Sequence, residues 1–157
     1  MNTLKLLALP LVMLLLLAGC GNDQEEIDEV YPEIILTAPD AFPVQCSALA
    51  SGETFTFRAL LQDNIELGSL SVDIHHNFDH HTHSTEPTDC DMEPVKTPEN
   101  PFLLIRDFPI PAGQRAYEVS FDIAVPADVD PGDYHFMIRL TDKTGWQSIR
   151  GLSIKIN

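Results

Sequence analysis

Apolar and polar residues alternate one by one through residues 117–125, and this pattern restricts the fold of the chain more than any other feature. The apolar residues of that segment are Tyr117, Val119, Phe121, Ile123 and Val125. Because successive side chains of a β-strand point to opposite faces, these residues share one face. The segment is therefore predicted to be a half-buried strand whose other face meets solvent.

Similar alternation recurs in residues 54–61, 70–75, 134–140 and 149–156, and shorter apolar runs occupy residues 33–37 and 102–108. Twelve prolines and eight glycines separate such segments, which favours short strands joined by turns over long helices. We interpret residues 40–52 as a loop. About seven short strands predict an all-β fold, an antiparallel β-sandwich formed by residues 33–157. The residues expected to face its core include Phe55, Phe57, Ala59, Leu61, Leu70, Val72, Ile74, Tyr134, Phe136, Ile138, Leu140, Leu152, Ile154 and Ile156.

Residues 1–19 have the features of a secretion signal, with Lys5 near the start and an apolar run over residues 6–18. The run is shorter than the roughly 20 residues that span a bilayer, so we do not expect a retained transmembrane helix. It ends in Leu17-Ala18-Gly19-Cys20, which resembles the lipobox of bacterial lipoproteins. The resemblance implies cleavage before Cys20, lipid on this cysteine, and anchoring in the cell envelope, in the outer membrane with periplasmic or surface display. The alternative is a soluble secreted protein in which Cys20 has no special role.

Acidic residues dominate the charge of the chain, which is −15 at pH 7 with histidines neutral. Residues 1–19 contain one lysine and no acidic residue, so the part from Cys20 onward has a net charge of −16. We exclude nucleic acid as a partner because its phosphates require a basic surface. Residues 20–32, acidic and poor in apolar side chains, are predicted to be a flexible tether.

Cys46 and Cys90 are the two cysteines that remain if Cys20 carries lipid. In the oxidising conditions that an exported protein meets, such a pair is expected to form a disulfide. Closing a loop of this length stabilises a fold by about 4 kcal/mol in the chain-entropy model. The alternative is that Cys90, beside Asp91 and Glu93, is a thiolate ligand of a metal.

Two motifs near the carboxyl end resemble the last strands of bacterial immunoglobulin-like domains. They are the corner Asp130-Pro131-Gly132-Asp133-Tyr134 and the turn Asp142-Lys143-Thr144-Gly145-Trp146. Together with the lipobox and the histidine-rich segment described next, they make the chain similar to a family of uncharacterised immunoglobulin-like lipoproteins of Gram-negative gut and oral bacteria. The resemblance implies an immunoglobulin-like sandwich, but no activity comes with it.

Five of the six histidines lie within residues 73–83, at the end of the strand predicted from residue 70 onward. The candidate ligands of this segment are His75, His76, His80, His81, His83, Asp73 and Asp79. Imidazole is a common ligand of transition metals, and a carboxylate can bind the metal or orient an imidazole. The segment therefore predicts a metal site. A solvated loop with weak, nonspecific metal binding is the alternative.

His135, the sixth histidine, is expected to approach this segment. In an immunoglobulin-like sandwich the strands at residues 69–78 and 134–140 are neighbours, and the alternation places His75 and His135 on the same outer face. Outward side chains of adjacent strands lie within about 5 Å of each other and can share an ion. Nitrogen and oxygen donors predict Zn²⁺ or Cu²⁺, and Met137 beside His135 adds slight weight to copper.

Enzymatic function is not expected from the motifs of the chain. His75-x-Asn77-x-Asp79-His80 is one residue away from the His-x-His-x-Asp-His motif of metallo-hydrolases of the β-lactamase type, but Asn77 stands where that motif has a ligand. The sequence has no His-Glu-x-x-His, Gly-x-Ser-x-Gly or phosphate-loop motif. We expect a lipoprotein that captures, buffers or delivers a divalent metal, with an uptake system or surface protein as its partner. The alternative is a structural or adhesive module that binds a glycan or a protein, with Trp146 as a candidate sugar platform.

Overall fold

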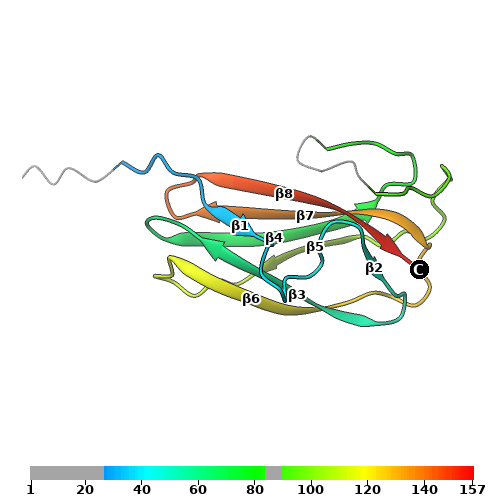
Figure 1. Cartoon of the computed structure of the whole chain (residues 1–157), viewed down its shortest axis with the longest axis horizontal. Helices are drawn as coiled ribbons and strands as arrows, with labels where there is room; N and C mark the ends of the chain where they lie inside the picture. Colours follow the sequence, from blue (N-terminus) through cyan, green and yellow to red (C-terminus); the bar gives the residue numbers. More distant parts are fainter. Residues whose placement is uncertain (1–26, 84–89) are drawn as a thin grey trace, which may run out of the picture.

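Two β-sheets packed face to face form the protein, whose computed structural model describes residues 27–83 and 90–157 (Figure 1). The predicted signal sequence and Cys20 lie outside the described residues. The smaller sheet has the strand order β1 (Glu33–Ile35), β3 (Thr54–Gln62), β6 (Ala116–Ala124). The larger sheet has the order β2 (Ser47–Leu49), β8 (Gln147–Ile156), β7 (Gly132–Asp142), β4 (Leu67–His76), β5 (Leu104–Phe108). The predicted all-β, immunoglobulin-like sandwich is confirmed.

The long antiparallel pair of β4 and β7 lies within the larger sheet and positions the histidines. Its register aligns Leu67 with Asp142 at one end and His76 with Tyr134 at the other. The sequence predicts that His75 and His135 share the outer face of neighbouring strands, and the register of this ladder places them directly opposite each other. Strand β5 pairs with the other side of β4 and is the edge strand expected near residues 102–108.

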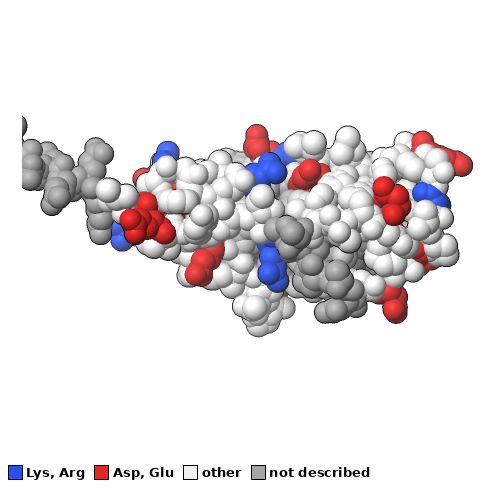
Figure 2. All heavy atoms as spheres, turned by 90° about the horizontal axis from the view of Figure 1, so that it is seen from above, with Lys and Arg blue, Asp and Glu red and all other residues white. Residues whose placement is uncertain are grey.

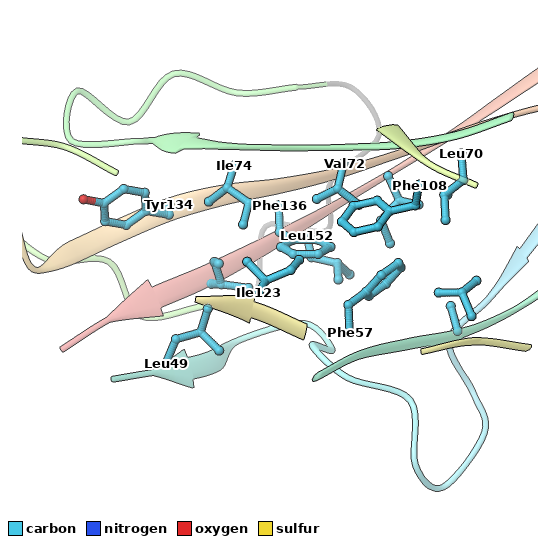
Figure 3. Packing of buried hydrophobic residues seen from close by; sticks show 14 of the residues in the cluster. Leu49, Phe57, Leu70, Val72, Ile74, Phe108, Ile123, Tyr134, Phe136 and Leu152 are labelled. Carbon is cyan, nitrogen blue, oxygen red and sulfur yellow. The ribbon is translucent and has the colours of Figure 1, made fainter. Parts of the chain in front are cut away.

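The core lies between the two sheets and is formed by the alternate residues that the sequence predicts (Figure 3). Phe57 of β3 and Phe136 of β7 are fully buried, and their ring centroids lie 5.4 Å apart. Val119 and Ile123 of β6 are also buried, whereas Phe121 on the same face is only partly covered. Each fully buried large apolar side chain stabilises the fold by about 1.5–3 kcal/mol. This core holds the two sheets in a fixed relation.

Strand β2 lies within residues 40–52, which were expected to be a loop, and its pairing is parallel rather than antiparallel. Ser47, Ala48 and Leu49 align with residues 154–156 of β8. Backbone hydrogen bonds from Cys46 N to Ser153 O (2.8 Å) and from Asn157 N to Leu49 O (2.9 Å) extend the pairing. The prediction was wrong here because three residues are too few to show a period of two, so only the neighbouring β8 reveals the strand.

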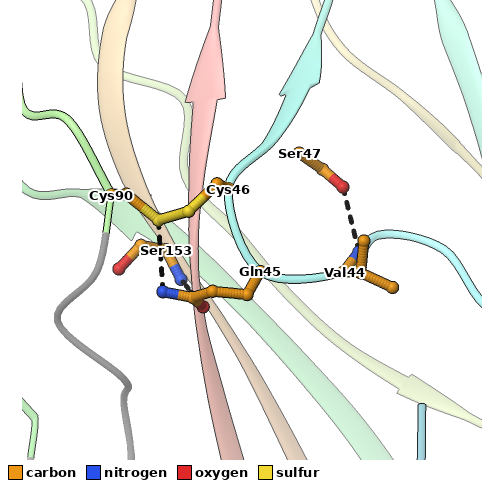
Figure 4. Close-up of a disulfide and its surroundings, with 6 residues drawn as sticks. All are labelled: Val44, Gln45, Cys46, Ser47, Cys90 and Ser153. Carbon is orange, nitrogen blue, oxygen red and sulfur yellow. Dashed lines mark hydrogen bonds between the residues drawn. A yellow bond between two sulfur atoms is a disulfide. The ribbon is translucent and has the colours of Figure 1, made fainter. Parts of the chain in front are cut away.

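A disulfide joins Cys46, directly before β2, to Cys90, which follows the histidine-rich segment (Figure 4). The S–S distance is 2.01 Å and the two Cα atoms lie 5.5 Å apart. The side chain of Gln45 donates a hydrogen bond to Cys90 Sγ (3.2 Å) and accepts one from Ser153 N (3.0 Å). In this structure Cys90 is therefore a structural cysteine. Because its sulfur is bonded to that of Cys46, it has no thiolate that could bind a metal.

The predicted corner before β7 is held by the buried hydroxyl of Tyr134. This hydroxyl donates a hydrogen bond to the carbonyl oxygen of Asp130 (2.6 Å) and accepts one from Phe102 N (3.1 Å). Burial raises the pKa of Tyr134 above its usual value, so the hydroxyl keeps the proton that it donates. The corner fixes the start of β7 and therefore the position of His135, the fourth residue of that strand.

Charged side chains are scattered over the face shown in Figure 2, and lysine and arginine form no continuous patch on it. One ion pair joins Lys155 Nζ to Glu93 Oε1 at 2.7 Å, and this contact lowers the pKa of Glu93.

In residues 27–83 and 90–157 the structure contains no helix with the length and apolar character needed to cross a membrane. The exclusion of nucleic acid stays a prediction from charge.

Candidate metal centre

Four of the six histidines converge on the outer face of the larger sheet, at the end where β4 stops and β7 begins. His75 comes from β4 and His135 from β7, while His81 and His83 belong to the segment that follows β4. One ring nitrogen of each lies within 4.8 Å of those of the other three. We call these four residues the histidine cluster.

The rings of the histidine cluster surround a common point rather than forming a row. Every pair of rings has its centroids between 4.6 and 5.7 Å apart. Nε2 of His75 and Nε2 of His83 are separated by 3.3 Å. Two nitrogens bound to Zn²⁺ at about 2.0–2.1 Å in tetrahedral geometry are separated by roughly 3.3–3.4 Å. The separation of 3.3 Å is that of a hydrogen bond between the two rings, and it is also compatible with two ligands of a tetrahedral ion.

Carboxylates orient two of these imidazoles through their other ring nitrogen. Asp73 Oδ1 lies 2.8 Å from Nδ1 of His75, and Asp79 Oδ1 lies 2.6 Å from Nδ1 of His81. When Nδ1–H donates a hydrogen bond to a carboxylate, the lone pair of the neutral ring is on Nε2. The hydrogen bond with His81 lowers the pKa of Asp79, so this carboxylate stays ionised and can hold the ring. Asp73 and Asp79 therefore act in the structure as orienting groups.

His135 is buried, with 1% of its surface exposed, although its place in the alternation is outward. His81 and His83, from the segment after β4, lie over it, and the centroid of each of their rings is 4.6 Å from that of His135. Nε2 of His135 lies 3.2 Å from the carbonyl oxygen of His81. His75 and His81 are more open, with 23% and 36% of their side chains exposed. The histidine cluster thus has a buried floor and an accessible rim.

His76 and His80 lie apart from the histidine cluster. The ring of His76 packs against Phe78, with centroids 5.0 Å apart, and its buried Nδ1 has no hydrogen-bond partner among the described residues. His80 has a positive φ of 59°, and its Nε2 lies 2.8 Å from the carbonyl oxygen of Glu93. His76 is the last residue of β4, so the alternation places its side chain on the opposite face of the sheet from His75, and the pattern could have separated it. His80 lies in the loop after β4, where the direction of a side chain depends on backbone turns that have no period.

A second group of metal-ligand type, Asp28, Asp63 and Asp142, lies at the other end of the β4–β7 ladder. Sequence reasoning did not find it. The three residues come from distant segments with no shared motif, so nothing local in the sequence could have indicated that they meet.

Comparison with known protein families identifies the chain. A family model described as "Domain of unknown function (DUF4625)" matches residues 18–157. The chain belongs to this family. No curated protein matches this DUF4625 member. Among solved structures it is similar to one titled "GspB Siglec domain", at 19% sequence identity and a TM-score of 0.42. The match covers 83% of this chain and 59% of the other, so this chain spans less than two thirds of that structure's length.

Proposed function

We propose that this DUF4625 member is a lipid-anchored protein of the bacterial cell envelope that binds a divalent transition metal, Zn²⁺ in the first place. The ligands are His75, His81, His83 and His135. The observation that carries the proposal is the convergence of four imidazoles around one point, with two of their nitrogens 3.3 Å apart. A solvated loop has no reason to hold four such rings together, because each protonated neighbour repels the others.

The spacing favours Zn²⁺ over Cu²⁺. Copper(II) prefers tetragonal sites, in which adjacent nitrogens at about 2.0 Å from the metal are separated by roughly 2.8 Å. The separation of 3.3 Å between His75 and His83 agrees better with a tetrahedron. Nitrogen ligands alone also make Ca²⁺ and Mg²⁺ unsuitable, since these ions require oxygen.

Four protein ligands favour holding a metal over catalysis with it. A catalytic Zn²⁺ normally keeps one position for water or substrate, whereas four imidazoles fill a tetrahedral shell. The accessible rim formed by His75 and His81 gives the metal a path of entry and exit. We therefore favour capture, buffering or delivery, with transfer to an uptake system or a surface protein.

The position of the histidine cluster agrees with such a role. Residues 27–32 lie at one end of the molecule, and the β4–β7 ladder carries His75 and His135 to the other end (Figure 1). In our proposal Cys20 bears the lipid, as the lipobox resemblance implies, and the acidic residues 20–32 form the tether, whose end is fixed to the sandwich through the buried Asp28. The metal would then be presented away from the membrane, where a partner protein can reach it.

The test is calorimetric titration of the purified full chain, without a histidine tag, with Zn²⁺ and Cu²⁺. We expect one tight equivalent of Zn²⁺ per chain. His75→Ala and His135→Ala should each weaken binding by at least about tenfold, since even the loss of a residue that only orients a ligand has that effect. His80→Asn is the matched control, because it removes a neighbouring imidazole and asparagine tolerates the positive φ of that position. Its affinity should equal that of the wild type.

Acid should weaken the binding because protons compete with the metal for imidazole nitrogens. We expect a lower affinity at about pH 5.5 than at about pH 7.5. An affinity that does not change over this range would contradict ligation by histidine. Weak binding of several ions, indifferent to His75→Ala and His135→Ala, would also overturn the proposal. The alternative function, a structural or adhesive module that binds a glycan or a protein, would then be favoured over metal binding.

A further inference from the structure

Three aspartates from distant parts of the chain meet at the end of the sandwich opposite the histidine cluster. Asp28 precedes β1, Asp63 directly follows β3, and Asp142 is the last residue of β7. One carboxylate oxygen of each lies within 4.8 Å of those of the other two. Asp28 and Asp142 are buried, with 7% and 4% of their surfaces exposed. We call these three residues the aspartate cluster.

Asp142 has one carboxylate oxygen that is fully engaged and one that is not. Its Oδ1 accepts hydrogen bonds from Thr144 Oγ1 (2.9 Å), Gly145 N (2.6 Å) and Trp146 N (2.9 Å). Its Oδ2 is buried and has no hydrogen-bond partner among the described residues. Buried polar atoms almost always have a partner, so a carboxyl oxygen left alone in the interior indicates a missing one.

Asp63 has the same division between its two oxygens. Its Oδ2 accepts hydrogen bonds from Ile65 N (2.8 Å) and Glu66 N (2.7 Å). Its Oδ1 is buried and, within the part of the chain that the structure describes, has no partner. The protein thus engages one oxygen of Asp63 and one of Asp142 and leaves the other of each for something else.

Positive charge from the protein does not balance these carboxylates. Thr144 Oγ1 lies 3.0 Å from Asp28 Oδ2 and 2.9 Å from Asp142 Oδ1, but a hydroxyl has one proton and can donate to only one of them. In residues 27–83 and 90–157 no lysine or arginine nitrogen lies within 4.0 Å of the aspartate cluster, and Lys143 instead approaches Glu66 at 3.9 Å. Three carboxylates this close repel one another unless a cation lies between them.

We propose that the aspartate cluster binds Ca²⁺. Calcium takes oxygen ligands at about 2.3–2.6 Å, so two oxygens on opposite sides of the ion lie up to about 5 Å apart, which accommodates the observed spacing. The smaller Mg²⁺ needs oxygens at about 2.0–2.1 Å in a strict octahedron and fits less well. Aspartate oxygens offer no nitrogen or sulfur donor, so the site would select a different ion from the histidine cluster. The site does not depend on the function proposed above.

Calcium at this position would fasten the end of the tether to the sandwich. Asp28 lies in that segment, and its backbone carbonyl accepts a hydrogen bond from Trp146 Nε1 (2.8 Å). The ring of Trp146 packs on Tyr31, with centroids 4.7 Å apart. Asn64 Nδ2 also donates a hydrogen bond to Asp28 Oδ1 (2.9 Å). Without the ion, such contacts hold the segment against the repulsion between the aspartates. With the ion, carboxylates from the segment before β1, from the residue after β3 and from the end of β7 all bind the same Ca²⁺.

The test uses the purified full chain in detergent, first freed of divalent ions with a chelator and then titrated with CaCl₂ by calorimetry. We expect one equivalent of Ca²⁺, and binding at least about tenfold weaker in Asp28→Asn and in Asp63→Asn, since each removes one ligand charge. Asp107→Asn, on the exposed edge strand β5, is the charge-matched control and should bind like the wild type. MgCl₂ should bind more weakly than CaCl₂.

Limited proteolysis gives a second readout that reports on the tether. A glutamate-specific protease cleaves after Glu29, which is exposed, only when the surrounding backbone opens. Calcium should slow this cleavage in the wild type and in Asp107→Asn, and should have no effect in Asp28→Asn. Absence of Ca²⁺ uptake by the wild type at millimolar concentration would overturn the proposal. Uptake that is unchanged in both Asp28→Asn and Asp63→Asn would overturn it equally.

Discussion

At the scale of single residues, the histidine cluster depends on carboxylates that do not belong to it. Asp73 precedes His75 by two positions on β4, so both side chains project from the same face and their polar atoms meet at 2.8 Å. Asp79 holds His81 in a similar way at 2.6 Å, but from a loop. Such carboxylates fix which nitrogen of the ring carries the proton and how the ring is turned.

Replacing Asp73 should therefore weaken metal binding without removing a ligand. We expect Asp73→Ala to lower the Zn²⁺ affinity by about tenfold. Asp73→Asn should have a smaller effect. Its amide oxygen still accepts a hydrogen bond from Nδ1–H of His75, although it carries no charge. Calorimetric titration of the two variants beside the wild type measures the series. An Asp73→Ala affinity equal to that of the wild type would show that the carboxylate does not orient His75.

The residue scale also shows what the alternation could and could not reveal. The pairing of His75 with His135 was predictable, because two outward residues of adjacent strands need only the strand order and the register. The burial of His135 was not, because it results from His81 and His83, which lie over it from the loop after β4. The choice of His81 and His83 over His80 depends on the same loop, whereas His76 is separated from His75 by the alternation of β4.

At the scale of elements, the segment between β4 and β5 is the part that completes the metal centre. It supplies His81 and His83, and it returns to the sandwich where Lys96 N donates to the carbonyl of Phe78 (3.0 Å) and Glu93 N donates to Asp133 Oδ2 (2.6 Å). The disulfide at Cys90 fastens the same segment to the start of β2. The segment is thus held in place at Phe78, Cys90, Glu93 and Lys96.

Removing the disulfide should lower both stability and metal affinity. For a sequence separation of 44 residues, the chain-entropy model gives about 4 kcal/mol of stabilisation. We expect the double variant Cys46→Ala/Cys90→Ala to lose roughly this free energy of unfolding in urea at neutral pH. Its Zn²⁺ affinity should also fall, because ordering a looser segment costs conformational entropy. An unchanged affinity would mean that the hydrogen bonds alone order His81 and His83.

At the scale of the whole molecule, the two candidate metal centres occupy opposite ends of one ladder. His135 and Asp142 both belong to β7, and seven steps along a strand span about 23 Å. The two sites differ in chemistry as well as in position, with imidazoles at one end and carboxylates at the other. Residues 27–32 lie at the end of the elongated domain where Asp142 is, and the β4–β7 ladder carries the histidine cluster to the other end (Figure 1).

Because of this distance, the two sites should act independently. Effects of substitutions more than about 7–10 Å apart with no shared partner normally add. We expect Asp28→Asn to leave the Zn²⁺ affinity unchanged and His75→Ala to leave the Ca²⁺ affinity unchanged. The double variant should show the sum of the two single effects in calorimetric titrations with each ion. A coupling energy clearly above about 0.5 kcal/mol would indicate that the β4–β7 ladder transmits a change between its ends.

The alternation in the sequence indicated the short strands, the inward faces of the long ones and the outward faces of His75 and His135, because a period of two is local and can be read along the chain. The strand order that makes these two histidines neighbours came from the resemblance to immunoglobulin-like domains. Only the tertiary structure decided the parallel strand β2, the selection of the two loop histidines that join the histidine cluster, and the meeting of Asp28, Asp63 and Asp142. These depend on where loops and chain ends return to the sandwich, and that is set by packing between residues far apart in sequence.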